Sequence, residues 1–197
     1  MKRRSAVLLT CSLLVAISIV FAQAPAQPAQ SQSQKRTVSG TLERALGNVE
    51  KEFVDAADAM PEDKYGFAPT QGEFKGVRTF AEQVRHVAAS NYQFGAAILG
   101  EKPPAPVEGE NENGPANLKS KADIMKYLRD SFAYMHKAVG SISEENLVEP
   151  INAFGGTGNA TRLGMATLTV GHAFDHYGQM VVYLRMNGII PPASRKQ

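Results

Sequence analysis

The sequence predicts an all-α protein whose single domain is a four-helix bundle with long crossover loops. Four stretches carry apolar side chains at three- and four-residue spacing, which is the period of an amphipathic helix. No stretch has a convincing alternation of apolar and polar residues that would indicate a strand. Beyond the N-terminal leader, roughly 160 residues are enough for one good core and too few for two comfortable domains. We expect the bundle to cover residues 38–194.

The N-terminus has the pattern of a secretory signal peptide. Three basic residues at 2–4 precede an apolar run over 6–21, and small residues follow around Ala22. This order predicts a signal peptide over residues 1–22, cleaved after Ala22, and therefore a periplasmic or secreted protein. The alternative is an uncleaved N-terminal anchor, because the run is near the short limit for a membrane span. Residues 23–37 are expected to form a flexible linker, rich in Pro, Gln, Ser and Ala.

Signal cleavage would change both the charge and the cysteine content of the chain. The segment removed holds three of the 21 basic residues, so 18 remain against 19 acidic residues and the formal net charge falls from +2 to −1. This balance gives no indication of a nucleic-acid surface. The single cysteine, Cys11, leaves with the signal, which excludes disulfides, thiolate ligands and a cysteine nucleophile. No membrane association is expected of the mature chain.

The first two helices are predicted from periodicity and from their end signals. Residues 39–59 place Leu, Val, Phe and Ala on one face, and Pro61 stops the helix. The second helix begins at Thr79, where Thr79 and Glu82 have the spacing of a capping box. It continues to Leu99, before a glycine and a pair of prolines.

The third and fourth helices have similar signals. Ser120 resembles a helix start, and a stripe of Met, Leu, Phe and Val follows to Gly140. The fourth helix covers about residues 161–187, with Gly188 at the C′ position and two prolines beyond it. Its helical wheel shows one apolar stripe and a second, more polar side. The stripe comprises Val170, Phe174, Tyr177, Val181 and Leu184, and the second side comprises Met165, Leu168, Thr169, His172, His176, Gln179 and Tyr183.

Two connections differ from ordinary bundle turns. The segment from Gly100 to Lys119, rich in Pro, Glu, Asn and Gly, is either a disordered crossover or a functional flap. The loop from Pro150 to Ala160 is rich in glycine but lacks the Lys-Ser/Thr ending of a phosphate-binding loop. We therefore expect a flexible linker there.

The fourth helix carries two of the four histidines of the chain. His172 and His176 are one helical turn apart, so their side chains project from the same side, about 5–6 Å apart at Cβ. Two imidazoles at that spacing can converge on one ion. The helix is apolar on most of its circumference and should be largely buried, where neutral imidazoles need partners. A divalent metal is the first hypothesis, and a pair satisfied by hydrogen bonds or half exposed to water is the alternative.

The sequence around this pair does not match a classical metalloprotease. In a His-Glu-x-x-His helix the second residue is acidic, but here it is Ala173. The inverted form is nearer, because Asp175 precedes His176, yet no acidic residue follows to complete its ligands. A third ligand must come from upstream. Taken alone, His86 lies on a polar side of the second helix like a surface histidine, and His136 borders an apolar stripe like a core-edge histidine.

The last helix and its exit carry a family resemblance. The stretch GHAFDHYGQMVVYLRMNGIIPP, residues 171–192, resembles the C-terminal signature of the DinB-like family. The second-helix segment TFAEQVRH, which ends in His86, resembles the earlier histidine motif of that family. The similarity in order and spacing covers about residues 38–194, and its C-terminal part is the more specific.

The resemblance implies a four-helix bundle that holds a divalent metal through three histidines, one from the second helix and two from the fourth. Carried over to this chain, the ligands are His86, His172 and His176. Three nitrogen ligands leave a position open for water or substrate, as in catalytic sites. Zinc, nickel, iron and manganese all remain candidates, since imidazole suits several of them. The candidates for a supporting or proton-transfer role are Asp175, Glu82, Gln179 and Tyr183.

The resemblance leaves two functions open. Family members of known activity are mostly metal-dependent thiol transferases and isomerases that use a low-molecular-weight thiol, but such thiols are cytosolic and this chain is expected to be exported. The first function is therefore a metal-dependent transferase or hydrolase that acts on a small molecule, with the metal as Lewis acid or as activator of bound water. The second is a non-catalytic metal-binding or structural bundle, which exposed helix faces would allow to form a homodimer.

Overall fold

The computed structural model describes residues 36–109 and 112–196. The predicted signal peptide over residues 1–22 and residues 23–35 of the predicted linker lie outside these ranges. The last linker residue, Thr37, is the N-cap of the first helix, because its hydroxyl accepts a hydrogen bond from the backbone N–H of Gly40. Helical structure therefore begins at Val38.

Four α-helices make up most of the described chain, as the sequence predicts. Each begins after a Thr or Ser whose side chain accepts a hydrogen bond from a backbone N–H of the first turn. At Thr79 the capping box is complete, since the Glu82 carboxylate also accepts from the Thr79 backbone N–H at 2.7 Å. The helices are α1 (Val38–Ala59), α2 (Phe80–Leu99), α3 (Lys121–Gly140) and α4 (Arg162–Met186).

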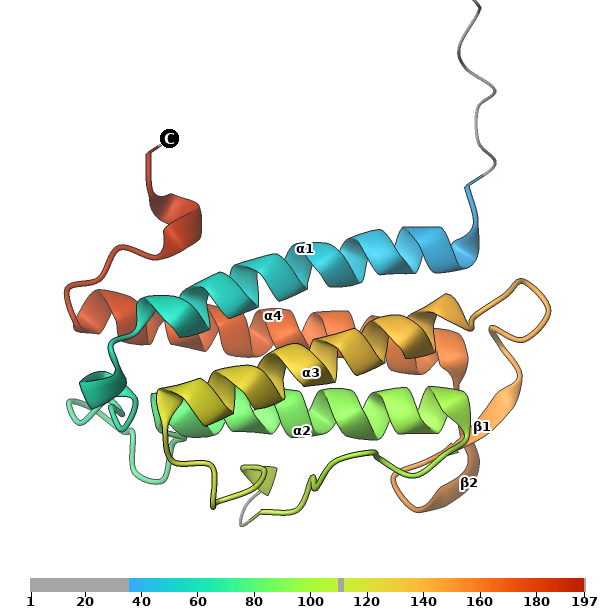
Figure 1. The fold of residues 1–197 in the computed structure, drawn as a ribbon, viewed down its shortest axis with the longest axis horizontal. Helices are drawn as coiled ribbons and strands as arrows, with labels where there is room; N and C mark the ends of the chain where they lie inside the picture. Colours follow the sequence, from blue (N-terminus) through green and yellow to red (C-terminus); the bar gives the residue numbers. More distant parts are fainter. Residues whose placement is uncertain (1–35, 110–111, 197) are drawn as a thin grey trace, which may run out of the picture. The chain divides into compact units, whose positions relative to one another are not determined.

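The four helices pack as a bundle in which α2 contacts α3 and α4, and α1 contacts the same two helices. Figure 1 shows α2 and α3 running in one direction and α1 and α4 running in the other. Parallel α2 and α3 need a connection that returns along the bundle, and the chain between Leu99 and Lys121 makes this crossover. Within the described residues, no helix is long and apolar enough to cross a membrane.

Large apolar side chains from all four helices fill the centre of the bundle. Full burial of one such side chain contributes about 1.5–3 kcal/mol. The core, rather than any polar site, therefore supplies most of the folding free energy. The largest fully buried apolar side chains are Phe53, Phe80, Phe132, Leu46, Met60, Ile98, Ile124, Leu128, Met135, Met180 and Leu184.

The buried face of α4 differs from the predicted apolar stripe. Of the five residues of that stripe only Leu184 is fully buried, and Phe174 is 40% exposed. The helical wheel alone did not show which side packs, because α4 is apolar around most of its circumference. The side that faces the core carries mostly smaller or more flexible residues. They are Met165, Ala166, Thr169, Ala173, His176, Met180, Tyr183 and Leu184.

The loop after α3 contains a β-hairpin, which corrects the prediction of a flexible linker and of a chain without strands. β1 (Pro150–Ala153) pairs antiparallel with β2 (Gly156–Thr161). The tip residues Phe154 and Gly155 both have positive φ angles, as a two-residue type I′ turn requires. The Asn159 side chain bonds to backbone groups of the facing strand. β2 is glycine-rich and polar, so side-chain hydrogen bonds stabilise it in place of the apolar alternation that predicts a strand.

Candidate metal centre

His86 of α2 and His172 and His176 of α4 meet at the interface between the two helices. The Nε2 atom of His172 lies 3.0 Å from that of His86 and 3.1 Å from that of His176. The three histidines each offer a ring nitrogen, and these atoms all lie within 4.8 Å of one another. Two nitrogens bound at about 2.1 Å to one tetrahedral ion are about 3.4 Å apart. The observed spacing is therefore close to what a shared ion requires.

Hydrogen bonds on the far side of two rings fix which nitrogen faces the centre. The backbone carbonyl of Glu112 can only accept, so His86 donates to it from Nδ1 at 2.6 Å. His176 likewise donates from Nδ1 to the side-chain carbonyl of Gln83 at 2.5 Å. A neutral imidazole with a protonated Nδ1 presents a lone pair at Nε2. His86 and His176 thus direct lone pairs at the same point, as metal-ligating histidines do.

His172 completes this cluster but cannot donate a hydrogen bond to both of the other two rings. If its Nε2 carries the proton, it can donate to only one of the two facing nitrogens, and its buried Nδ1 has no hydrogen-bond partner in the described structure. If its Nδ1 carries the proton, three lone pairs face one another without a donor. Either tautomer leaves a buried nitrogen unpaired, which is costly. A divalent cation would satisfy all three Nε2 lone pairs, so these residues fit a metal ion.

Burial keeps the three imidazoles neutral. His86 and His176 are buried, and His172 is partly buried. Loss of hydration, followed by repulsion between the rings, lowers the pKa of His172 to about 4 and that of His176 to about 3. Burial lowers the pKa of His86 as well. Because neutral imidazole is the form that binds metals, protons compete weakly for this cluster near neutral pH.

Gln83 orients His176, a role that the sequence alone did not indicate. It precedes His86 by three residues on α2 and is 2% exposed. Its amide group donates to the Gln179 side-chain carbonyl at 2.8 Å, and Gln179 donates to the Asp175 carboxylate at 3.2 Å. Two amides thus link His176 to a carboxylate on the exposed side of α4. The three-residue spacing from His86, which places both side chains on one helix face, was the signal that could have identified it.

The four predicted supporting residues divide between this network and other roles. Gln179 and Asp175 belong to the network, one and two steps beyond Gln83. The Tyr183 hydroxyl donates to a backbone carbonyl before α2, at 3.1 Å. The Glu82 carboxylate is engaged in the capping box of α2. Among the described residues, none of these four side chains forms a hydrogen bond with a clustered histidine.

Two different surroundings border the histidines along α2. Toward the C-terminal end of α2, Phe94 packs edge-on against His172 with ring centroids 5.7 Å apart, and Phe154 of the hairpin tip packs on Phe94 at 5.6 Å. Toward its N-terminal end lies a cavity of about 580 Å³, lined in part by Gln83 and Gln179. The lining of this cavity contains no histidine. The cluster therefore has an aromatic neighbour on one side and a polar cavity on the other.

The crossover between α2 and α3 is docked on this region of the bundle. Three side chains bind its part near the histidines, and His86 is one of them. Arg78 donates from Nε to the Asn113 side chain at 2.7 Å, and Arg85 donates to the Leu118 carbonyl at 3.1 Å. These contacts do not agree with a disordered crossover over residues 112–118, and the other alternative, a functional flap, stays a prediction.

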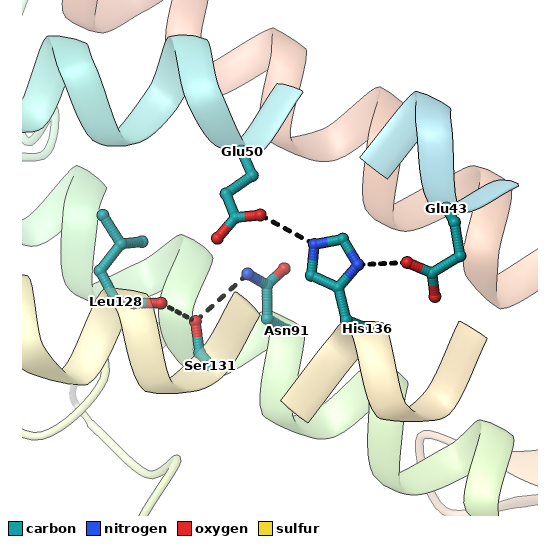
Figure 2. Close-up of polar contacts among 6 residues, drawn as sticks. All are labelled: Glu43, Glu50, Asn91, Leu128, Ser131 and His136. Carbon is teal, nitrogen blue, oxygen red and sulfur yellow. Dashed lines mark hydrogen bonds and ion pairs between the residues drawn. The ribbon is translucent and has the colours of Figure 1, made fainter. Parts of the chain in front are cut away.

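His136 lies in a separate cluster between α1 and α3 (Figure 2). Its Nδ1 pairs with Glu43, and its Nε2 pairs with Glu50 at 2.8 Å. Figure 2 also shows the buried Asn91 of α2 donating to Ser131 of α3 in the same region. Burial opposes a charge on the ring, but the two carboxylates outweigh it and raise the pKa of His136 above 6.5. Because both ring nitrogens already have partners, this histidine is separate from the three-histidine cluster.

Comparison with known proteins supports the fold. A crystal structure of a conserved protein from Enterococcus faecalis matches with a TM-score of 0.61 at 18% identity, over 77% of this chain and 97% of that chain. A crystal structure of a DinB-like protein from Bacillus cereus ATCC 10987 matches with a TM-score of 0.60 at 17% identity, over 79% of this chain and 96% of that chain. No curated protein matches the chain. At these identities the solved structures establish a shared fold alone.

The sequence itself carries the family assignment. The model of the DinB superfamily matches residues 45–180, a range that contains all three clustered histidines. That range also holds α2 and α3 in full and most of α1 and α4. The helices that bring the three histidines together are thus those of a known family, and the chain belongs to the DinB superfamily.

Proposed function

We propose that the mature protein binds one divalent transition metal ion through His86, His172 and His176 and uses it for a transfer or hydrolysis reaction on a small molecule. The convergence of three Nε2 atoms carries this proposal. Hydrogen bonds hold two of them as lone pairs, and the third ring cannot supply a donor to both. A cluster kept only for hydrogen bonding would instead give each buried nitrogen a partner.

The chain's own residues would hold the ion and keep its ligands in the binding tautomer. A divalent metal held by these three imidazoles would supply a Lewis acid toward a substrate oxygen or a water molecule. Gln83 and the Glu112 carbonyl keep the lone pairs of His176 and His86 directed at the centre. Phe94 covers one side of His172 with an apolar ring. Zinc, nickel, iron and manganese are all compatible with this donor set.

We further propose that this chemistry takes place in the periplasm or outside the cell. The proposal rests on the basic residues at 2–4, the apolar run that follows and the small residues around Ala22. Intact mass and N-terminal sequencing of the protein from fractionated cells would test it. A mature chain that begins at Gln23 in the periplasmic or culture fraction is expected. A full-length chain in the membrane fraction would support the uncleaved anchor and contradict export.

A non-catalytic metal-binding bundle is the second candidate, and one observation favours it. The residues that line the polar cavity include no histidine, so the three Nε2 atoms do not open directly into it. An ion whose remaining position is closed by packed side chains would be held tightly and would turn nothing over. The two candidates thus differ in substrate access and share the same ligands.

Metal content and turnover, measured on the same preparation, distinguish the candidates. The chain from Gln23 is purified without a metal-affinity tag, loaded separately with each of the four metals, and assayed for hydrolysis of small esters and for thiol transfer. The catalytic proposal predicts one equivalent of metal and a turnover that His172→Ala abolishes. One equivalent without turnover would support the binding bundle, and no metal after loading would contradict both candidates.

A further inference from the structure

The cavity beside the three histidines is lined mainly by charged and amide groups. Its volume of about 580 Å³ is in the range of small-molecule sites. It is formed by the segment that leads into α2, the first turns of α2, one residue of α4 and the described part of the crossover. The charged and amide side chains that line it are Arg78, Glu82, Gln83, Arg85, Asn113 and Gln179.

Among the described lining residues, basic side chains outnumber acidic ones. Two of these residues are arginines, Arg78 and Arg85, and one is acidic, Glu82. This carboxylate accepts hydrogen bonds from the backbone N–H and the hydroxyl of Thr79, at 2.7 and 2.9 Å. It also lies in the first turn of α2, where the helix dipole balances negative charge. The Glu82 carboxylate is therefore already balanced by groups at the start of its own helix.

Arg85 is buried with part of its guanidinium group unsatisfied. Arg85 is only 9% exposed, and one terminal nitrogen of its guanidinium group donates to the Leu118 carbonyl. Its Nε is buried and has no hydrogen-bond partner in the described structure. Within the same residues, no carboxylate forms a salt bridge with it. A buried guanidinium without a counter-charge is costly, so an anion in the cavity would stabilise it.

The cavity is coupled to the candidate metal centre. Gln83 lines the cavity and also binds His176 directly. None of the three histidines is among the described residues that line the cavity, so Gln83 is a link between the cavity and the cluster. A group bound in the cavity would therefore be separated from the candidate metal centre by Gln83.

We propose that this cavity is an oxyanion subsite that binds a carboxylate or phosphate group of the substrate through Arg78 and Arg85. A guanidinium fork matches the oxygen pairs of both groups. The tight packing of the crossover shapes the site, since a Cβ atom on Gly114 would lie 2.8 Å from the Arg85 carbonyl oxygen. The statement that the bound anion is part of a substrate rests on the proposed function, whereas the binding of an anion depends only on the cavity. The substrate class is a small acidic molecule whose reacting bond lies close to its anionic group.

Titration of the full mature chain with acetate and, separately, with inorganic phosphate tests this subsite. Binding is followed through the NMR chemical shifts of the Gly76 and Gly114 backbone amides, because both residues line the cavity. Zinc-loaded and metal-free protein are compared, with ionic strength held constant by sodium chloride. Saturable shifts are expected at both glycines. The titrant that saturates at the lower concentration identifies carboxylate or phosphate as the group that the subsite prefers.

Three variants identify the residues responsible. Arg78→Met should weaken anion binding by at least about tenfold, because it removes charge-assisted hydrogen bonds. Arg78→Lys, which keeps the charge but loses the fork, should have a smaller effect. Arg44→Met is the matched control, since Arg44 is exposed on α1 and does not line the cavity, and it should bind like the wild type. If circular dichroism shows that Arg78→Met is unfolded, Arg85→Lys replaces it.

The subsite proposal is overturned if neither anion gives saturable shifts or if binding is unaffected by Arg78→Met. It is also overturned if anion binding disappears in His172→Ala, because the anion would then be a ligand of the metal. Zinc content of the same samples is a separate measurement. One equivalent of zinc without anion binding contradicts only the subsite, whereas anion binding without zinc contradicts only the metal-dependent function.

Discussion

The two histidine clusters of the bundle use the same side chain in opposite ways. At the α2–α4 interface three imidazoles face one another, and burial lowers the pKa of His176 to about 3. At the α1–α3 interface His136 lies between Glu43 and Glu50, and its pKa is raised (Figure 2). Burial lowers the pKa in both clusters, and the two carboxylates reverse the direction of the shift at His136. Three neutral nitrogens attract a cation, whereas a charged ring whose two nitrogens are both paired with carboxylates needs no further partner.

This difference predicts that the two clusters affect different properties, metal binding at the first and folding stability at the second. The three-histidine cluster buries nitrogens without donors, which is a cost to the metal-free protein. The His136 cluster links α1 to α3 through two ion pairs and contributes to folding. Changes at the first cluster are therefore expected to alter metal affinity, and changes at the second are expected to alter stability with metal affinity unchanged.

The largest effect is expected from His172→Ala. Its Nε2 is the one that lies near both other Nε2 atoms, so its loss should reduce zinc affinity by more than about 100-fold, beyond the usual effect of losing an orienting partner. Competition with a chelator of known affinity measures this change. Far-UV circular dichroism should show unchanged helix content, because the core stabilises the bundle. Retained affinity would show that His172 is not a ligand.

The next largest effect is expected from Gln83→Met. This change removes the acceptor that fixes the His176 tautomer, so zinc affinity should fall about 10- to 100-fold. Gln93→Met is the control, since Gln93 is an exposed glutamine on the same helix. The same chelator competition measures both variants. Equal affinities would mean that the hydrogen bond to Gln83 does not tune the site.

A smaller effect, on stability alone, is expected from His136→Gln. Because the folded-state pKa of His136 is raised, its contribution is fully present below the unfolded value of about 6.5 and is lost as pH rises through the folded pKa. In chelator, urea unfolding should show the variant less stable by about 1 kcal/mol at pH 6, and the gap should close at high pH. The lowered pKa values of the other histidines affect both proteins and cancel in the difference. A gap that does not change with pH would contradict the ion-pair account.

The smallest effects are expected at single carboxylates. Glu50→Gln should lower the free energy of unfolding by about 0.5–1 kcal/mol, because Glu50 pairs with His136 at a partly buried position. Lys51→Met removes an exposed pair with Asp55 on the same helix and should have no measurable effect. Urea unfolding at pH 6 compares the two variants. A larger loss from Lys51→Met would contradict the role assigned to burial.

Local sequence signals predicted most of the fold. Thr79 with Glu82, Ser120 and Gly188 mark helix ends by backbone chemistry that acts within a few residues, and the structure confirms each. The packing side of α4 depends instead on its neighbours in space, so the helical wheel alone could not identify it. The hairpin at residues 150–161 was missed because its turn and side-chain hydrogen bonds, rather than apolar alternation, define it.

The candidate site was only partly predictable from local signals. The one-turn spacing of His172 and His176 indicated a shared ligand, but His86 resembled a surface residue because its helix face also carries Glu82, Gln83 and other polar side chains. In the structure that face packs against α4 and the crossover, so the polar side chains bind one another. Family resemblance, rather than periodicity, identified His86 as the third member. Its carbonyl partner at Glu112 lies on a distant segment that periodicity does not place.

Metal content tests the contrast between the two clusters most directly. The chain from Gln23 is purified without a metal-affinity tag and measured by mass spectrometry as wild type, His86→Ala and His136→Ala. One equivalent of a transition metal is predicted in the wild type and in His136→Ala, and none in His86→Ala. An equal content in all three proteins, a loss confined to His136→Ala, or no metal in the wild type after reconstitution would contradict the three-histidine centre.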